Sequence, residues 1–286
     1  MNSLSMNQPP VSIVIPTFNR AHYLEQCIDS ALNQTYPCEI IVCDHGSTDN
    51  TPEIVKKYEG KITYVRREKD LGVHSTWLDA ILHATSDFIH INYDDDWIEP
   101  TFIEACMKLM DANTGFVFAN VKLFNESDQS YTETQLNRFF KTTGNYSMWK
   151  LYYFEMNNLL SPGCAIFRKE VLVNNLFIGK MPFAQKEYKG VGPDLLFTLM
   201  SSMDYTRFGF VEDYLAVFRE HENSITIDAV NNLEKKKKIA DAYNEARVYF
   251  MINKFVKFFG IRRMMLFFLK GTLALVSPIK KLNRKK

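Results

Sequence analysis

The chain has 286 residues, of which 46% are hydrophobic and 14% aromatic, enough to bury one large domain or one domain with an appendage. The formal net charge of +1 hides an asymmetry: residues 232–286 hold 15 Lys and Arg against 3 Asp and Glu, a net +12, which leaves −11 for residues 1–231. Five dispersed cysteines without CxxC spacing argue against a disulfide framework or a zinc site and favour a reducing cytoplasm.

The first elements of the chain are predicted as strand, helix and strand. The stretch MNSLSMNQPP has no basic or apolar region of a signal peptide, so none is expected. Residues 11–15 (VSIVI) and 39–43 (EIIVC) are short apolar, β-branched runs, typical of strands buried on both faces. Between them, residues 21–34 have an apolar face at helical spacing.

The same alternation continues to residue 93. Thr51 is a plausible helix N-cap because Pro52 follows at the first helical position. Residues 62–65 and 88–93 are predicted strands, and residues 73–84 form the helix between them. Strands that alternate with helices indicate βαβ units and a parallel sheet with helices on both faces.

Polar turns follow three of these strands. They are residues 17–20 (TFNR), 44–47 (DHGS) and 94–96 (DDD). In open α/β sheets ligands bind at the carboxyl ends of the strands, so these turns are expected to converge on one site. A nucleotide diphosphate with a metal ion suits such an edge.

Asp94, Asp95 and Asp96 are three consecutive carboxylates. Neighbouring anions repel one another, and they fit best beside a hard divalent cation such as Mg²⁺ or Mn²⁺, which prefers oxygen ligands. A solvated acidic turn is the alternative, because runs of like charge are usually solvated.

Residues 11–58, from VSIVIPTFNR to EIVKKY, resemble the opening of family 2 glycosyltransferases, and ATSDFIHINYDDDWIEP resembles the DxD region of that family. The resemblance runs to about residue 226. It implies a GT-A, Rossmann-like fold with a mixed, mostly parallel sheet flanked by helices. It also implies inverting transfer of a sugar from a nucleotide-sugar, most often a UDP-sugar, with Mn²⁺ or Mg²⁺ as cofactor.

The resemblance also assigns roles to residues. Asp44 is expected to accept from the base, Asp95 to contact the ribose and Asp96 to ligate the metal, while Asp94 takes one of the last two roles under a one-residue shift. The residues expected to contact the nucleotide-sugar are Pro16, Thr17, Phe18, Asn19, Arg20, Asp44, Gly46, Ser47, Asp94 and Asp95.

Two departures from the family pattern concern the donor contacts. His45 stands where the family usually has a second Asp, and the usual Asn in the helix after Gly72 is missing, its place taken by Thr76, Trp77 or Leu78.

The second half of the chain holds the expected base. Residues 115–124 are a predicted strand, and the polar residues 125–145 are a predicted loop. By resemblance Asp194 is the catalytic base, although Pro193 replaces the family's first acid there. The alternative is that Asp194 merely caps the helix over residues 195–203.

After a β-rich run over residues 208–218 comes the pattern R-x-H-x-x-S, with Arg219, His221 and Ser224, which resembles the closing motif of the family. His221 is therefore a candidate metal ligand or diphosphate contact. A lone histidine in a structural role is the alternative.

The tail is predicted to be a helical, membrane-associating extension. Residues 262–276 are strongly apolar but interrupted by Lys270 and Gly271, too short for a membrane span. Basic residues around an apolar helix are typical of an anchor on anionic lipid, and the many Phe, Leu and Met residues argue against nucleic acid. Packing against a partner subunit, including a second copy of this chain, stays open.

We therefore expect a glycosyltransferase domain over residues 1–228, with a donor half at about 9–125 and an acceptor half at about 126–228, followed by a basic helical extension over 229–286. The expected enzyme lies on the cytoplasmic face of a membrane and extends a glycan or a lipid-linked oligosaccharide. The alternatives are a degenerate, non-catalytic nucleotide-sugar-binding module and, with less support, a nucleotidyltransferase, which would normally show a Gly-rich basic loop after the first strand.

Overall fold

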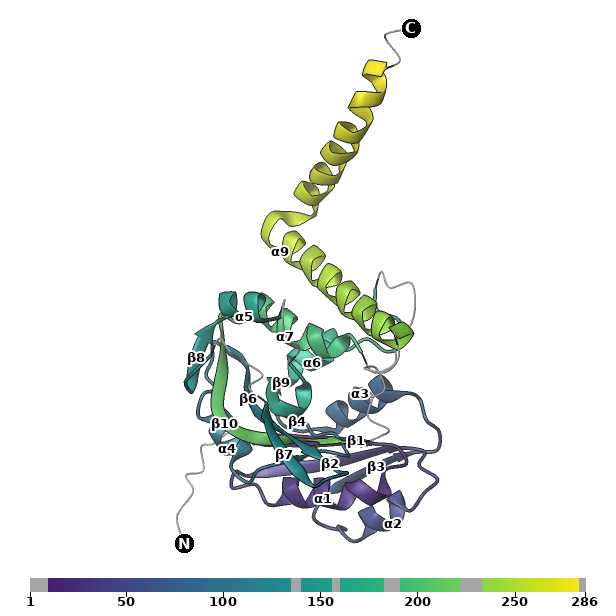
Figure 1. The fold of residues 1–286 in the computed structure, drawn as a ribbon, viewed down its shortest axis with the longest axis vertical. Helices are drawn as coiled ribbons and strands as arrows, with labels where there is room; N and C mark the ends of the chain where they lie inside the picture. Colours follow the sequence, from purple (N-terminus) through teal and green to yellow (C-terminus); the bar gives the residue numbers. More distant parts are fainter. Residues whose placement is uncertain (1–9, 135–139, 156–159, 183–190, 222–232, 283–286) are drawn as a thin grey trace.

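The computed structural model describes residues 10–134, 140–155, 160–182, 191–221 and 233–282. Over these residues ten strands form one mixed sheet with helices on both faces (Figure 1). Eight strands follow the order β3-β2-β1-β4-β9-β6-β10-β5, while β7 pairs with β6 and β8 pairs with β10. The predicted α/β class, a mixed sheet flanked by helices, is confirmed.

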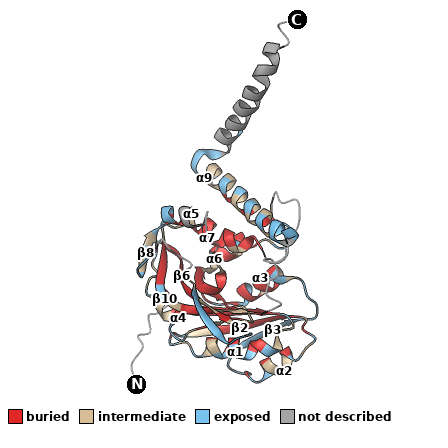
Figure 2. Ribbon diagram, in the orientation of Figure 1, coloured by how far each residue is buried: buried red, intermediate tan, exposed pale blue. Residues whose placement is uncertain are grey.

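The first four strands along the chain run parallel to one another. Every residue of the first strand is buried, because helices cover both faces of this part of the sheet, and Figure 2 shows the buried layer in red. The strands are β1 (Val11–Thr17), β2 (Cys38–His45), β3 (Thr63–Arg67) and β4 (Phe88–Ile91).

Helices cover the parallel strands from two sides. α1 (Ala21–Leu32) and α2 (Thr51–Lys56) pack together on one face, and α3 (Val73–His83) covers the other (Figure 1). In α1, Leu24 and Ile28 are fully buried at a spacing of four residues, so one face of the helix enters the core. Each such side chain contributes about 1.5–3 kcal/mol through burial.

The start of α2 differs from the prediction by one residue. Thr51 is the first helical residue, and the N-cap is Asn50. Asp49 Oδ1 accepts hydrogen bonds from the Thr51 N–H at 3.0 Å and from the Thr51 hydroxyl at 2.6 Å. The Asp49 carboxylate therefore accepts from the Thr51 N–H, one of the N–H groups at a helix start that have no partner within the helix.

Beyond β4 the sheet is mixed, because β9 and β5 run opposite to their neighbours. β9 (Ala165–Arg168) is antiparallel both to β4 and to β6 (Thr114–Asn125). β10 (Arg207–Glu220) then runs parallel to β6, and β5 (Trp97–Ile98) pairs with it in antiparallel register. The end of β10 consequently lies beside the residues that follow Asp96.

An aromatic core fills this second part of the sheet. Its fully buried phenylalanines stack on one another at centroid distances of 5.4–6.3 Å; among them are Phe116, Phe118, Phe167 and Phe208. The helices that cover it are α4 (Phe102–Met107), α6 (Lys169–Asn175) and α7 (Pro193–Asp204), and a 3₁₀ helix, η1 (Pro162–Cys164), precedes β9.

The predicted loop over residues 125–145 is partly wrong. β7 (Ser130–Thr134) folds back on β6 as an exposed antiparallel edge strand, from Val121 opposite Thr134 to Asn125 opposite Ser130. Its Tyr131, Thr132 and Thr134 are residue types that favour strands, despite the polarity and exposure of the segment. Residues 135–139 lie outside the described part, and β8 (Gly144–Ser147) and α5 (Met148–Glu155) follow.

α9 (Leu233–Leu282) is interrupted at Gly260, whose φ of 74° and ψ of 154° are not helical. Its first arm packs on α7, and its second arm leads away from the domain (Figure 1). No helix in the described part of the chain is long and apolar enough to cross a membrane.

Candidate active site

The carboxyl ends of β1, β2 and β4 meet at one edge of the sheet, as the sequence predicts. Thr17 lies opposite Asp44 in the register of β1 and β2, and Val14 lies opposite Ile91 in that of β1 and β4. The Asn92 N–H extends this pairing by donating to the Val14 carbonyl at 2.9 Å. The three polar turns that follow these strands are therefore neighbours.

The turn after β1 is fastened to the turn after β2. Asn19 has a φ of 54°, a left-handed conformation that Asn tolerates better than most residues. Its backbone N–H donates to Ser47 Oγ at 2.9 Å, and its side-chain Oδ1 accepts from the Thr48 N–H at 2.8 Å. Phe18 remains 42% exposed at the edge of this turn.

Asp44 lies beneath these turns and is fully buried. Its Oδ1 accepts from the Ser47 N–H at 2.9 Å, and its Oδ2 accepts from the Tyr64 hydroxyl at 2.7 Å. Gly46, with a φ of +80°, has no room for a Cβ, which would lie 3.0 Å from the Glu68 carbonyl oxygen. Asp44 thus shapes the turn as well as being a candidate contact for the base.

The residues expected to contact the nucleotide-sugar therefore form two layers. Pro16, Thr17, Asp44 and Ser47 are buried and set the backbone of the turns. Solvent reaches the second layer, which comprises Phe18, Asn19, Arg20, Gly46, Asp94 and Asp95. The structure brings the two layers together, and their contacts to a nucleotide stay a prediction.

Asp94, Asp95 and Asp96 diverge to three different partners. Asp94 Oδ2 lies 3.4 Å from the Phe18 N–H, which ties the acidic stretch to the turn after β1. Asp95 Oδ2 lies 3.1 Å from His221 Nε2, and Asp96 Oδ1 accepts from the Arg219 N–H at 2.8 Å. Burial raises the pKa of Asp94 and of Asp96, and the neighbouring Asp95 charge raises both further.

Arg219 holds its positive charge behind these carboxylates. Its side chain is 8% exposed, and its Nε donates to the Asp95 carbonyl at 3.0 Å. The guanidinium carbon lies 4.6 Å, 5.0 Å and 5.4 Å from the ring centroids of Tyr23, Trp97 and Phe124. Arg219 is the first residue of the pattern R-x-H-x-x-S, and its place two residues before His221 is the only signal in that pattern for a role at this site.

The donor set at this edge suits a hard cation. Three carboxylates, two of them with raised pKa values, lie near the Arg20 and Arg219 guanidinium groups and the His221 imidazole, and Arg219 also pairs with Glu126, so a divalent cation would relieve their repulsion. The predicted ligands Asp96 and His221 both lie here, but His221 contacts Asp95 and not Asp96. Ser224 lies outside the described residues.

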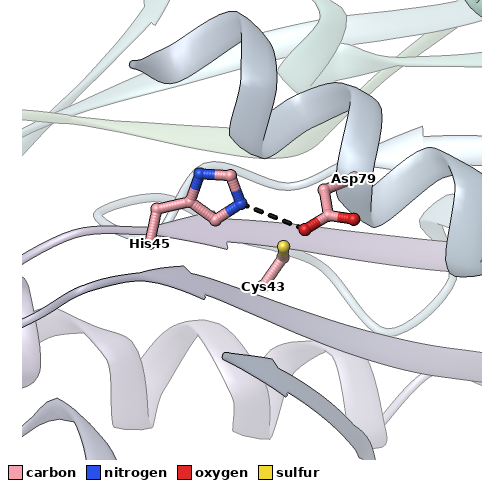
Figure 3. Close-up of side chains that lie close together, drawn as sticks. All are labelled: Cys43, His45 and Asp79. Atoms are coloured by element: carbon pink, nitrogen blue, oxygen red, sulfur yellow. Dashed lines mark hydrogen bonds and ion pairs between the residues drawn. The ribbon is translucent and has the colours of Figure 1, made fainter. Parts of the chain in front are cut away.

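A tighter group of ligand-type atoms lies elsewhere in the described part of the chain, between β2 and α3 (Figure 3). One ligand atom from each of Cys43, His45 and Asp79 falls within 4.8 Å of the others. Arg67 occupies both Asp79 oxygens, at 2.6 Å and 2.7 Å, and its hydrogen bond lowers the Asp79 pKa to about 2. Burial raises the pKa of the Cys43 thiol to about 12, so this thiol is protonated at neutral pH.

This group is better explained as a polar link than as a metal site. His45 Nε2 lies 3.2 Å from Asp79 Oδ2, so the side chain that departs from the family pattern reaches toward α3 (Figure 3). The His45 imidazole therefore serves the packing of β2 on α3.

Asp194 lies in the first turn of α7. Gly192, and not Asp194, is the N-cap residue, while the Asp194 side chain accepts from backbone N–H groups at the start of the helix. Asp194 Oδ1 accepts from the Gly192 N–H at 2.9 Å, and its Oδ2 accepts from the Tyr243 hydroxyl at 3.0 Å. Burial raises the Asp194 pKa, and the charge of Asp194 is second to burial in raising the pKa of Tyr93. Asp194 thus lies within electrostatic range of the residue that precedes the acidic stretch.

A cavity of about 440 Å³ lies away from this edge, among α6, α7 and α9. Glu170, Asp204 and Tyr249 are among the residues that line it, and none of the predicted site residues does.

Comparison with known sequences agrees with this geometry. A family model described as Glycosyl transferase family 2 matches residues 12–175. An uncharacterised glycosyltransferase of Rickettsia typhi is 30% identical over 233 residues, which is 79% of this chain and 69% of that protein. Chondroitin synthase of Pasteurella multocida is 41% identical over 103 residues, 35% of this chain, but the match spans only 11% of that longer protein.

Solved structures share the fold at low identity. TarS of S. aureus in complex with UDP-GlcNAc has a TM-score of 0.59 at 18% identity, with 89% of this chain and 77% of that chain covered. Mannosyltransferase PcManGT from Pyrobaculum calidifontis, in complex with GDP-Man and Mn²⁺, has a TM-score of 0.52 at 18% identity and covers 97% of this chain and 84% of that one. The sequence match over more than half of the chain and the shared fold confirm the resemblance seen in its motifs: the chain belongs to glycosyl transferase family 2, a family of glycosyltransferase enzymes.

Proposed function

We propose that the protein transfers a sugar, with inversion, from a nucleotide-sugar to a hydroxyl group of a glycan or lipid-linked acceptor in polysaccharide synthesis. The observation that carries this is the convergence at one sheet edge of the turns after β1, β2 and β4, with the half-buried carboxylate of Asp194 within electrostatic range of that edge. A neighbour in complex with UDP-GlcNAc supports a UDP-sugar as donor.

Asp194 is the proposed base. It takes the proton of the acceptor hydroxyl while that oxygen forms a bond to the anomeric carbon and the bond from that carbon to the phosphate oxygen breaks. A pKa raised by burial suits this work, because a base is most effective when its pKa is near the working pH.

Asp95, Asp96 and His221 would hold a divalent cation, and Asp94 lies next to them. When bound, the cation supplies positive charge that stabilises the departing nucleoside diphosphate. Arg219 keeps Asp95 and Asp96 in place from behind through its backbone N–H and its guanidinium. The turn around Asn19 and Ser47 would orient the nucleoside.

A screen of nucleotide-sugars by thermal shift with Mn²⁺ tests this function. A donor at about 100 times its Kd stabilises the folded protein by about 2.7 kcal/mol, so Tm is expected to rise by several degrees with one class of nucleotide-sugar. Transfer to an acceptor, or slow hydrolysis of the donor, is expected for the same compound. A protein that binds the donor and does neither would be a degenerate binding module.

The second arm of α9 is proposed to lie on an anionic membrane surface. Large apolar side chains stay exposed on both sides of the interruption at Gly260: Met265 on the second arm, and Val248, Met251, Phe258 and Phe259 on the first. Residues 262–286 contain eight Lys and Arg residues, and anionic lipid attracts such a basic segment.

Deleting residues 262–286 is expected to abolish co-flotation with vesicles that contain phosphatidylglycerol, while the full chain floats with them and stays unbound to phosphatidylcholine alone. Flotation followed by gel densitometry measures this. Equal binding of the truncated and full chains to these vesicles would contradict the membrane role. A change in oligomeric state on truncation would indicate that the arm packs against a partner subunit instead.

A further inference from the structure

The first arm of α9 docks against the helix that carries Asp194. Ala246 and Phe250 of α9 pack in one apolar cluster with Leu195 and Leu196 of α7. Gly192, at the start of α7, has a φ of +111°, and a Cβ added there would lie 3.0 Å from Met181 Cε and 3.7 Å from the Ala242 carbonyl oxygen. α9 therefore lies close over the first turn of α7.

This docking brings Tyr243 to the Asp194 carboxylate. The Tyr243 hydroxyl donates to Oδ2 at 3.0 Å, while the Gly192 N–H donates to Oδ1 at 2.9 Å. These two donors, together with the Leu195 N–H, hold both oxygens and keep the carboxylate from rotating freely. The anionic group also lies in the first turn of a helix, where the helix dipole favours negative charge.

We propose that Tyr243 is a positioning residue for the base, so that α9 completes the active site by holding the Asp194 carboxylate through a hydrogen bond. This inference rests on the proposed function, because it assigns Tyr243 a part in the transfer reaction. It gives the C-terminal helix a role in the chemistry that is separate from any contact with lipid. Tyr243 lies outside the stretch matched by the family model, which ends at residue 175.

The hydrogen bond from Tyr243 lowers the pKa of Asp194. Burial raises the Asp194 pKa, whereas the hydrogen bonds from Leu195, Tyr243 and Gly192 oppose that rise because they stabilise the ionised form. Among the residues that the structure describes, Tyr93, from the turn after β4, is a further titratable group within electrostatic range of Asp194. Removing the Tyr243 hydroxyl should therefore raise the Asp194 pKa, and the ionised base should form only at higher pH.

Tyr243→Phe tests the proposal, because it removes the hydroxyl and keeps the ring that packs on α7. We expect the acidic limb of the kcat/KM profile to move up by about one pH unit, with a loss of about tenfold below that limb, recovery at high pH and unchanged donor affinity. Tyr249→Phe is the matched control, since Tyr249 belongs to the same helix and packs against Phe177 at a centroid distance of 5.2 Å.

A second readout needs no turnover. The side-chain carboxyl of Asp194, identified by its loss in Asp194→Asn, is titrated by carbon NMR in wild type and in Tyr243→Phe. A higher pKa in the variant is expected. An unchanged Asp194 titration or an unmoved acidic limb overturns the inference alone, whereas a wild-type protein that transfers no sugar counts against the proposed function.

Discussion

Asp194→Asn is expected to lower kcat by about 10³-fold, within the range of 10²–10⁴ that a positioned general base supplies, and to leave donor affinity unchanged. The amide matches the carboxylate in shape, so its oxygen still accepts from the Gly192 N–H. Its nitrogen can donate to the Tyr243 hydroxyl, which keeps α9 in place. Only the ability to take a proton is lost. Initial rates and nucleotide binding by calorimetry measure the two effects separately.

Asp213→Asn is the control for this variant, because Asp213 is an exposed acid on β10 and is not one of the candidate site residues. It should turn over like the wild type. Near-wild-type kcat in Asp194→Asn would remove Asp194 as the base and leave it a structural role at the start of α7.

Asp96→Asn is expected to lose transfer by more than about 10²-fold together with the Mn²⁺-dependent part of nucleotide binding. The amide oxygen still accepts from the Arg219 N–H, so the local backbone is retained. One of three repelling charges disappears, and we expect Tm without ligand to rise by about 2 °C, which corresponds to a gain of under 1 kcal/mol.

Thermal shift with and without Mn²⁺, UDP and a chelator measures the nucleotide binding and the Tm without ligand. Initial rates measure the transfer. Wild-type protein with chelator should resemble Asp96→Asn in its nucleotide binding. A variant that binds UDP with Mn²⁺ as well as the wild type does would show that Asp96 is no ligand, and the contact between Asp95 and His221 would then mark the better candidates.

The parallel part of the fold was predictable because its signals are local. The apolar runs at residues 11–15 and 39–43 predict the buried strands β1 and β2. Their parallel pairing then places the turns that follow them at one edge of the sheet. Local patterns failed where a partner from elsewhere decided the outcome. Residues 130–134 are polar yet form β7, because the free edge of β6 is there to pair with them.

The candidate site divides in the same way. The three turns and Asp194 follow from motifs, whereas the pairings of Asp95 with His221 and of Asp96 with the Arg219 N–H depend on how β10 inserts beside β6. His45 was a departure with no visible reason in the sequence. Its partner Asp79 lies 34 residues later in the chain, on α3, and no local sequence pattern indicates this contact.

The insertion of β10 between β6 and β5 also sets the order in which the enzyme can mature during synthesis. The partner of Asp96, Arg219, is synthesised 123 residues later, and the partner of Asp95, His221, 126 residues later. Until the ribosome has passed residue 221, the emerging chain carries three adjacent carboxylates without the guanidinium and imidazole that face them. A chimera that takes residues 9–125 from a relative therefore also needs the end of β10 from the same relative.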